Sequence, residues 1–144
     1  NMAVIEGKAY WASVTTPNTK FEPVYTVSLL VDEDIAKSFA SKGYSIKQLQ
    51  EGPALVIKRK VATKAGKKNA PPKLIDINQQ PLDVLVGNGS DVKVQYREWE
   101  TTNNYGNFKG LDFQAMQVIN LVPYGGSADA DGAELGYVEE ESEF

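Results

Sequence analysis

Apolar and polar residues alternate with a period of two through most of the chain, and this alternation restricts the fold more than any other feature. The alternating segments are rich in β-branched and aromatic residues, and clusters of Pro, Asn, Gly and Ser separate them. The sequence therefore predicts a mainly β protein. The predicted strands are residues 3–16, 24–31, 54–61, 74–77, 82–86, 91–100 and 108–122.

One segment departs from the strand pattern. Residues 32–43 begin with acidic residues, carry Ile35 and Phe39 four positions apart and end at Gly43, which predicts a helix. Ser45 is expected to start a further turn of helix that runs to Gln50.

Six or seven strands with one helical insertion favour a small closed barrel, which we interpret as an elaborated OB-fold with a short helical insertion. Its helix is expected between the third and fourth strands, or displaced by an insertion. An immunoglobulin-like sandwich is the alternative, because the predicted helix comes early, between the second and third strands. Periodicity alone does not separate the two architectures.

The residue types that the chain lacks exclude several kinds of chemistry. There are no cysteines and no histidines among the 144 residues. Disulfides, thiolate nucleophiles and cysteine-based metal sites are therefore excluded, and the commonest general base and metal ligand are missing. We expect a protein that is not an enzyme and has no cofactor or metal. No apolar run reaches the roughly 18–20 residues of a membrane span, so we also expect a cytosolic protein.

Positive and negative charges are segregated along the sequence. Residues 1–122 carry all 15 Lys and Arg against 12 acidic residues, whereas residues 123–144 carry seven acidic residues and no cation. Residues 1–122 are therefore predicted to form the folded domain, and residues 123–144 an acidic, flexible C-terminal tail.

One predicted strand combines cations with a large aromatic side chain. In residues 92–99, alternation places an apolar set on one face and Lys93, Gln95, Arg97 and Trp99 on the other. Single-stranded nucleic acid needs cations near its phosphates and a flat ring for an unstacked base. This face is therefore a candidate DNA-binding surface. The alternative is a tryptophan that covers one end of a barrel beside ordinary solvated cations.

A second basic segment supports the same interpretation. Lys58 and Lys60 are expected to share one face of their strand, and a flexible loop adds Lys64, Lys67 and Lys68. A basic loop beside a basic sheet face would attract a polyanion. A solvated surface loop is the alternative.

Further aromatic residues are candidates for base stacking. Tyr10 and Trp11 are expected to point to opposite faces, one into the core and one outward, and we favour Tyr10 as the stacking residue. Tyr105 and Phe108 lie in or beside the last hairpin, where burial is expected to be incomplete.

Two other functions are compatible with the sequence. Asp83, Asp91 and Lys93 resemble the carboxylate and lysine set of Mg²⁺-dependent nucleases, although the string is short and common. A β-rich phage structural protein is the second alternative, with its basic faces in contact with other subunits.

Several strings recur together in a known family. They are Gly7-Lys8-Ala9-Tyr10-Trp11-Ala12, Phe21-Glu22-Pro23, the turn Gly87-Asn88-Gly89-Ser90, the strand at residues 110–118, and an acidic tail that ends in Phe144. In their order they resemble the single-stranded DNA-binding proteins of lytic, short-tailed bacteriophages.

That resemblance implies an OB-fold that coats exposed single strands without sequence preference during phage DNA replication and recombination, in the cytoplasm of the infected bacterium. It also implies that the tail contacts phage replication proteins such as the polymerase and the helicase-primase, and that the chain can form a homodimer. The expected partner-binding residues are Glu139, Glu140, Glu141, Glu143 and Phe144.

Overall fold

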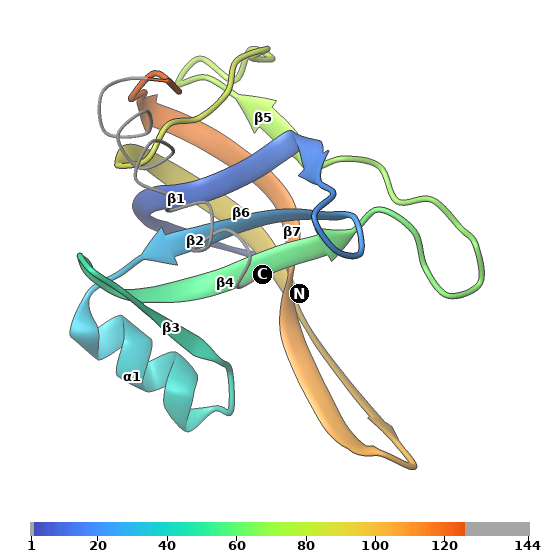
Figure 1. Ribbon diagram of the computed structural model, residues 1–144. Helices are drawn as coiled ribbons and strands as arrows, with labels where there is room; N and C mark the ends of the chain where they lie inside the picture. The colour runs from blue at the N-terminus through green and yellow to red at the C-terminus, as the bar shows by residue number, and fades with distance from the viewer. Residues whose placement is uncertain (1, 126–144) are drawn as a thin grey trace.

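The computed structural model describes residues 2–125, which form seven strands and one helix (Figure 1). In chain order these are β1 (Met2–Asn18), β2 (Val24–Leu30), α1 (Glu33–Ser41), β3 (Ile46–Leu49), β4 (Gly52–Lys60), β5 (Lys73–Ile75), β6 (Ser90–Asn103) and β7 (Gly106–Asn120).

The strands form one sheet in the order β3-β4-β2-β1-β6-β7-β5. A parallel pairing of β4 with β7, through Lys58 and Asp112, closes β1, β2, β4, β7 and β6 into a five-stranded barrel. A closed five-stranded barrel of this kind is the OB-fold. The predicted OB-fold is therefore confirmed, and the sandwich alternative is wrong.

β1 holds the two halves of the barrel together because it pairs on both of its edges. Residues 2–9 pair with β6, and residues 8–18 pair with β2. A Cβ at Gly7 would lie 2.3 Å from the carbonyl oxygen of Leu30, so only glycine allows this close approach.

Alternate residues of the barrel strands fill the core. Val27, Leu29, Leu55, Ile57 and Phe113 are all fully buried. The helix covers one end of the barrel, where the Phe39 ring packs edge-on against Tyr44 and Tyr96, with centroid distances of 5.7 and 6.1 Å. The charged side of the helix faces solvent, as its apolar spacing predicts.

The helix predicted at residues 32–43 is confirmed, and it lies between β2 and β4, the second and third barrel strands, which is the displaced position. The structure corrects two other expectations about the elements. Residues 46–49, expected to be part of a helical turn, form strand β3, because β4 offers them a free edge. Residues 82–86 form no strand: the Leu82 amide donates to the carbonyl of Leu74 in β5 at 3.0 Å, and Val86 forms an isolated bridge with Pro123.

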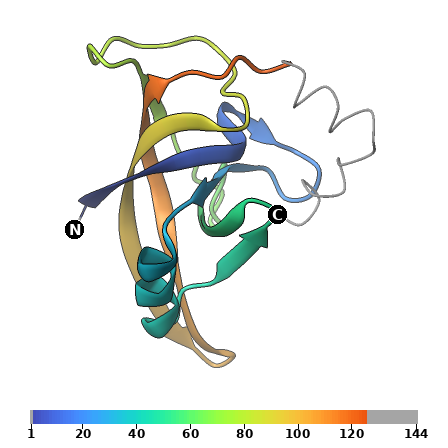
Figure 2. The same cartoon turned by 90° about the vertical axis from the view of Figure 1, so that its left-hand side faces the viewer.

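The last two strands are longer than predicted. β6 and β7 pair from Asp91 and Asn120 to Asn103 and Gly106, so residues expected to form a loop continue the ladder. In both views the end of this hairpin extends beyond the barrel (Figures 1 and 2). We call residues 98–109 the arm.

Within residues 2–125, no helix is long and apolar enough to cross a membrane. Residues 126–144 lie outside the part of the chain that the structure describes. The acidic tail and the domain boundary at residue 122 therefore stay predictions.

We expect Gly7→Ala to destabilise the barrel by about 1–3 kcal/mol, since the new methyl group must push β1 away from the Leu30 backbone. Urea unfolding measures this loss. Thr101→Ala, on the exposed arm, is the control and should change the free energy of unfolding by less than about 0.5 kcal/mol. An unchanged midpoint for Gly7→Ala would contradict the close approach of β1 and β2.

Candidate nucleic-acid interface

The outer face of β6 carries the cations and the tryptophan that alternation predicts. Val92, Val94 and Tyr96 are buried, whereas Lys93 and Arg97 are exposed on the opposite face. Neither cation forms an ion pair within residues 2–125. Both charges therefore remain available to a polyanion.

Two aromatic side chains share this outer face on the arm. Trp99 is the register partner of Gly110, and the next outward position of β7 holds Phe108. A Cβ on Gly110 would lie 2.8 Å from the Trp99 ring, so the indole lies directly over the glycine. Trp99 and Phe108 are still 44% and 45% exposed, and Tyr105, at the tip of the arm, is 90% exposed. The arm therefore offers ring faces to solvent, and Trp99 does not cover a barrel end.

The arm is braced against the end of α1. On its inner side, the Tyr44 hydroxyl donates to Glu98 Oε1 at 2.5 Å. The Lys109 ammonium donates to the carbonyl of Lys42 at 2.5 Å and lies 4.7 Å from the centre of the Tyr44 ring. Burial, followed by the Glu98 hydrogen bond, raises the pKa of Tyr44 to about 12. These contacts fix the direction of the aromatic face.

The two basic strands meet at one residue. Asp112 on β7 is the register partner of both Lys58 on β4 and Arg97 on β6. One strand spacing on each side of β7 puts the Cα atoms of Lys58 and Arg97 about 10 Å apart around the barrel. Arg59 neutralises the intervening carboxylate, with its Nη1 at 2.7 Å from Asp112 Oδ2.

The outer cations of these strands form what we call the basic band, which consists of Lys58, Lys60, Lys93 and Arg97. Lys58 and Lys60 share one face of β4, as predicted. Lys60 approaches Glu22 at 3.6 Å, but both side chains are more than half exposed, so this pair is weak.

The loop that follows β4, expected to be flexible, contains backbone hydrogen bonds between residues 61 and 69. The amide of Thr63 donates to the carbonyl of Lys67 at 2.8 Å, and a bridge joins Ala62 to Lys68. These bonds form a small hairpin on which Lys64, Lys67 and Lys68 are all exposed. The three lysines thus extend the basic band beyond the end of β4.

Tyr10 lies on the outer face of β1, where Ser28 is its partner on β2 and Val56 follows on β4. Thr26 and Ser28 are fully buried outer-face residues whose hydroxyls have no hydrogen-bond partner among residues 2–125. Sequence reasoning missed both of them. The signal was present, because two small hydroxyl residues alternate with Tyr25, Val27 and Leu29 along β2.

The expected contrast between Tyr10 and Trp11 is wrong. Both side chains are half-buried, because a bulge interrupts the pairing of β1 with β2 between Tyr10 and Ser13. Trp11 has a φ of 52°, which costs about 1–2 kcal/mol for a residue with a Cβ. The Asn88 side chain stabilises this bulge by accepting a hydrogen bond from the Trp11 amide at 2.8 Å.

Asp91, one of the two carboxylates of the proposed nuclease set, already has hydrogen-bond partners. Asp91 accepts hydrogen bonds from Lys8 Nζ at 2.8 Å and Asn120 Nδ2 at 3.2 Å, which lower its pKa. Among residues 2–125, no group of three metal-ligating side chains occurs. The expected partner-binding residues, Glu139, Glu140, Glu141, Glu143 and Phe144, lie outside the described residues.

No protein-family model matches the chain, and no curated protein sequence matches it. Solved structures do. The chain is similar to gp2.5, a single-stranded DNA-binding protein encoded by bacteriophage T7, with a TM-score of 0.66, 16% identity and 93% of each chain covered.

The chain is also similar to the single-stranded DNA-binding protein from bacteriophage Enc34, with a TM-score of 0.56, 15% identity and coverage of 91% of this chain and 89% of that one. The complex of the Enc34 protein with single-stranded DNA matches with a TM-score of 0.56 and 14% identity, over 85% and 89% of the two chains. At these identities the similarity establishes a shared fold. The resemblance to phage single-stranded DNA-binding proteins is thus confirmed for the architecture.

We expect one of the seven tyrosines to ionise only near pH 12, because burial and Glu98 favour the neutral Tyr44 hydroxyl. A raised pKa contributes stability that is complete below about pH 10 and is lost as the pH rises toward 12. Absorbance titration of tyrosinate measures the transition. Tyr44→Phe should remove it, and its survival in this variant would contradict the assignment.

Proposed function

We propose that the chain is a non-enzymatic single-stranded DNA-binding protein of a bacteriophage. It binds exposed strands without sequence preference during DNA replication and recombination, in the cytoplasm of the infected host. The phosphates follow the basic band and the lysine hairpin, while unstacked bases lie on Trp99, Phe108, Tyr105 and Tyr10.

One observation carries this proposal. Two exposed cations, Lys93 and Arg97, and two half-exposed rings, Trp99 and Phe108, lie on one continuous outer face of β6 and β7. A solvated surface would need no aromatic rings beside its cations, whereas a single strand uses both. Stacking on a ring and neutralisation of phosphate do not depend on base identity, so binding without sequence preference follows.

The similar structures support the same function. Both the T7 and the Enc34 proteins bind single-stranded DNA, and the chain matches more than 80% of the length of each. OB-folds bind oligonucleotides on the face of the second and third strands and on neighbouring loops, including the one between the fourth and fifth strands. The positions of Lys58 and Lys60 on the third barrel strand, and of the arm between the fourth and fifth, support the proposal.

Residues 123–144, the acidic end of the chain, are the candidate segment for binding other proteins. Residues 123–144 carry seven acidic residues and no cation, and the sequence ends in Phe144. We infer that Glu139, Glu140, Glu141, Glu143 and Phe144 contact phage replication proteins, and that the chain associates as a homodimer. A pull-down with and without residues 126–144 tests the first inference, and light scattering tests the second.

We expect Trp99→Ala to weaken binding to oligothymidylate by about ten- to a hundredfold, because the loss of one stacking ring costs about 1–3 kcal/mol. Fluorescence anisotropy of a labelled oligonucleotide measures the affinity. Trp99→Phe keeps a ring and should retain most of it. If Trp99→Ala melts at the parent temperature and binds DNA normally, the arm does not contact bases.

We expect the salt dependence of binding to become shallower when Lys64, Lys67 and Lys68 are changed together to Ala. Each phosphate contact on a single strand contributes about −0.7 to the slope of log K against log salt, so three lost contacts change it by about 2. Lys37→Ala, which removes an exposed cation from α1, is the control and should leave the slope unchanged. An unchanged slope in the triple variant would place the hairpin outside the site.

A further inference from the structure

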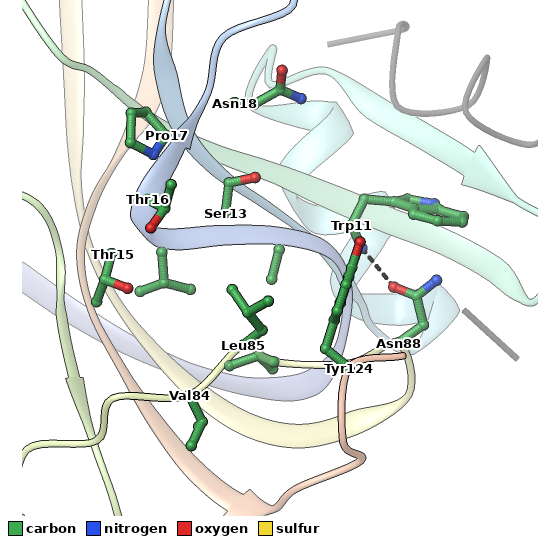
Figure 3. A pocket seen from close by; sticks show the side chains of 13 residues that line it. Trp11, Ser13, Thr15, Thr16, Pro17, Asn18, Val84, Leu85, Asn88 and Tyr124 are labelled. Carbon is green, nitrogen blue, oxygen red and sulfur yellow. Dashed lines mark hydrogen bonds between the residues drawn. The ribbon is translucent and has the colours of Figure 1, made fainter. Parts of the chain in front are cut away.

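A pocket beside the β1 bulge is not explained by the basic band or by the arm. Its walls are residues 11–18 of β1, the segment at residues 84–88, and Tyr124. Figure 3 shows Trp11 and Tyr124 close together at one end, with Thr15 and Val84 toward the other. We propose that this pocket is a second base-binding site, which takes one unstacked nucleobase of the single strand.

The chemistry of the walls selects a neutral, flat group. None of the 13 lining residues is charged, so nothing in the pocket attracts a phosphate or repels a base. Trp11 and Tyr124 provide ring faces, and Ser13, Thr16 and Asn18 provide hydroxyl and amide groups for the polar edge of a base. The volume of about 270 Å³ lies just below the roughly 300–1,000 Å³ of typical ligand pockets, which suits a single base.

The backbone at Trp11 gives an independent reason to assign a binding role. A positive φ of 52° at a bulky residue persists only when neighbouring groups enforce it, and such residues cluster at binding sites. Here the hydrogen bond from the Trp11 amide to Asn88 Oδ1 enforces it. Trp11 is thereby held at one end of the pocket, among the residues that line it.

The far wall is also held in place. The amide of Gly87 donates to the carbonyl of Val122 at 2.8 Å, and Val86 bridges to Pro123. These bonds position Tyr124, whose side chain is 57% exposed, opposite the bulge. The backbone on both sides of the pocket is therefore held by hydrogen bonds before a ligand arrives, which lowers the entropic cost of binding.

The pocket lies next to the basic band. Ser13 pairs with Thr26, which pairs with Lys58, and Asn18 pairs with Val24, which pairs with Lys60. Two strand spacings, about 10 Å, therefore separate the backbone of Ser13 from that of Lys58, and the backbone of Asn18 from that of Lys60. A strand whose phosphates follow Lys58 and Lys60 can place a base in the pocket, so the inference rests on the proposed function and extends its binding path.

Trp11 provides a direct test, since the chain has only two tryptophans. In Trp99→Phe, Trp11 is the sole reporter, and oligothymidylate should quench its emission. An oligomer in which abasic sites replace the thymines keeps the phosphates and should bind without quenching. If DNA binds while Trp11 emission stays unchanged, the pocket assignment is wrong and the proposed function still stands; if no oligomer binds at low salt, the proposed function itself fails.

An affinity comparison avoids variants of the strained bulge, which could fail to fold. Tyr124→Ala, at an exposed position, should weaken binding to oligothymidylate about ten- to a hundredfold and leave binding to the abasic oligomer unchanged. Ile77→Ala, which removes an equally exposed apolar side chain away from the pocket, should change neither. Equal losses for both oligomers would overturn the proposal, as would a Tyr124→Ala variant that binds oligothymidylate with unchanged affinity.

Discussion

The charge on Asp112 organises the surface that we assign to DNA. Its carboxylate lies at the seam where β4 meets β7, between Lys58 and Arg97, and without a counterion it would repel a phosphate. The Arg59 guanidinium satisfies it at 2.7 Å, and both side chains are about three-quarters buried. Arg59 also donates to the carbonyl of Ala70 at 2.9 Å, so the same side chain fixes the base of the lysine hairpin. The cations on both sides of the seam are thus left to act as one band.

The surface that we assign to DNA keeps its cations and its aromatic rings in different places. Cations lie on β4, on β6 and on the lysine hairpin, whereas rings lie on the arm and in the uncharged Trp11 pocket. Rings held by a rigid support lose little entropy when a base stacks on them. Tyr44 and Lys109 give the arm that support, and Asn88 does the same for Trp11. The polar contacts that hold these rings are therefore as important for the proposed base stacking as the rings themselves.

Local patterns predicted those features that depend on strand alternation alone. Lys93, Arg97 and Trp99 share a face because the register shift after Gln95 places its extra residue on β7, so β6 keeps its alternation. The pairing of β2 with β4 is regular at Lys58 and Lys60. Alternation failed at Trp11, where the bulge depends on Asn88, a residue 77 positions away. It also failed for β3, whose four residues become a strand only against the edge of β4. The approach of Lys58 to Arg97 depends on barrel closure, which no local pattern encodes.

The seam also bears on how the protein folds. Arg59 and Asp112 are 53 residues apart in the sequence, and the ladder between their strands is parallel with a single register pair. Contacts this distant in sequence carry a large loop-closure entropy, so they form after the hairpins β1–β2 and β6–β7, and β-barrels of this kind fold in milliseconds to seconds. The basic band is complete only once the seam has formed. A chain in which only the two hairpins have formed therefore has the cations of β6 but not yet the continuous band that Lys58 and Lys60 join across the seam.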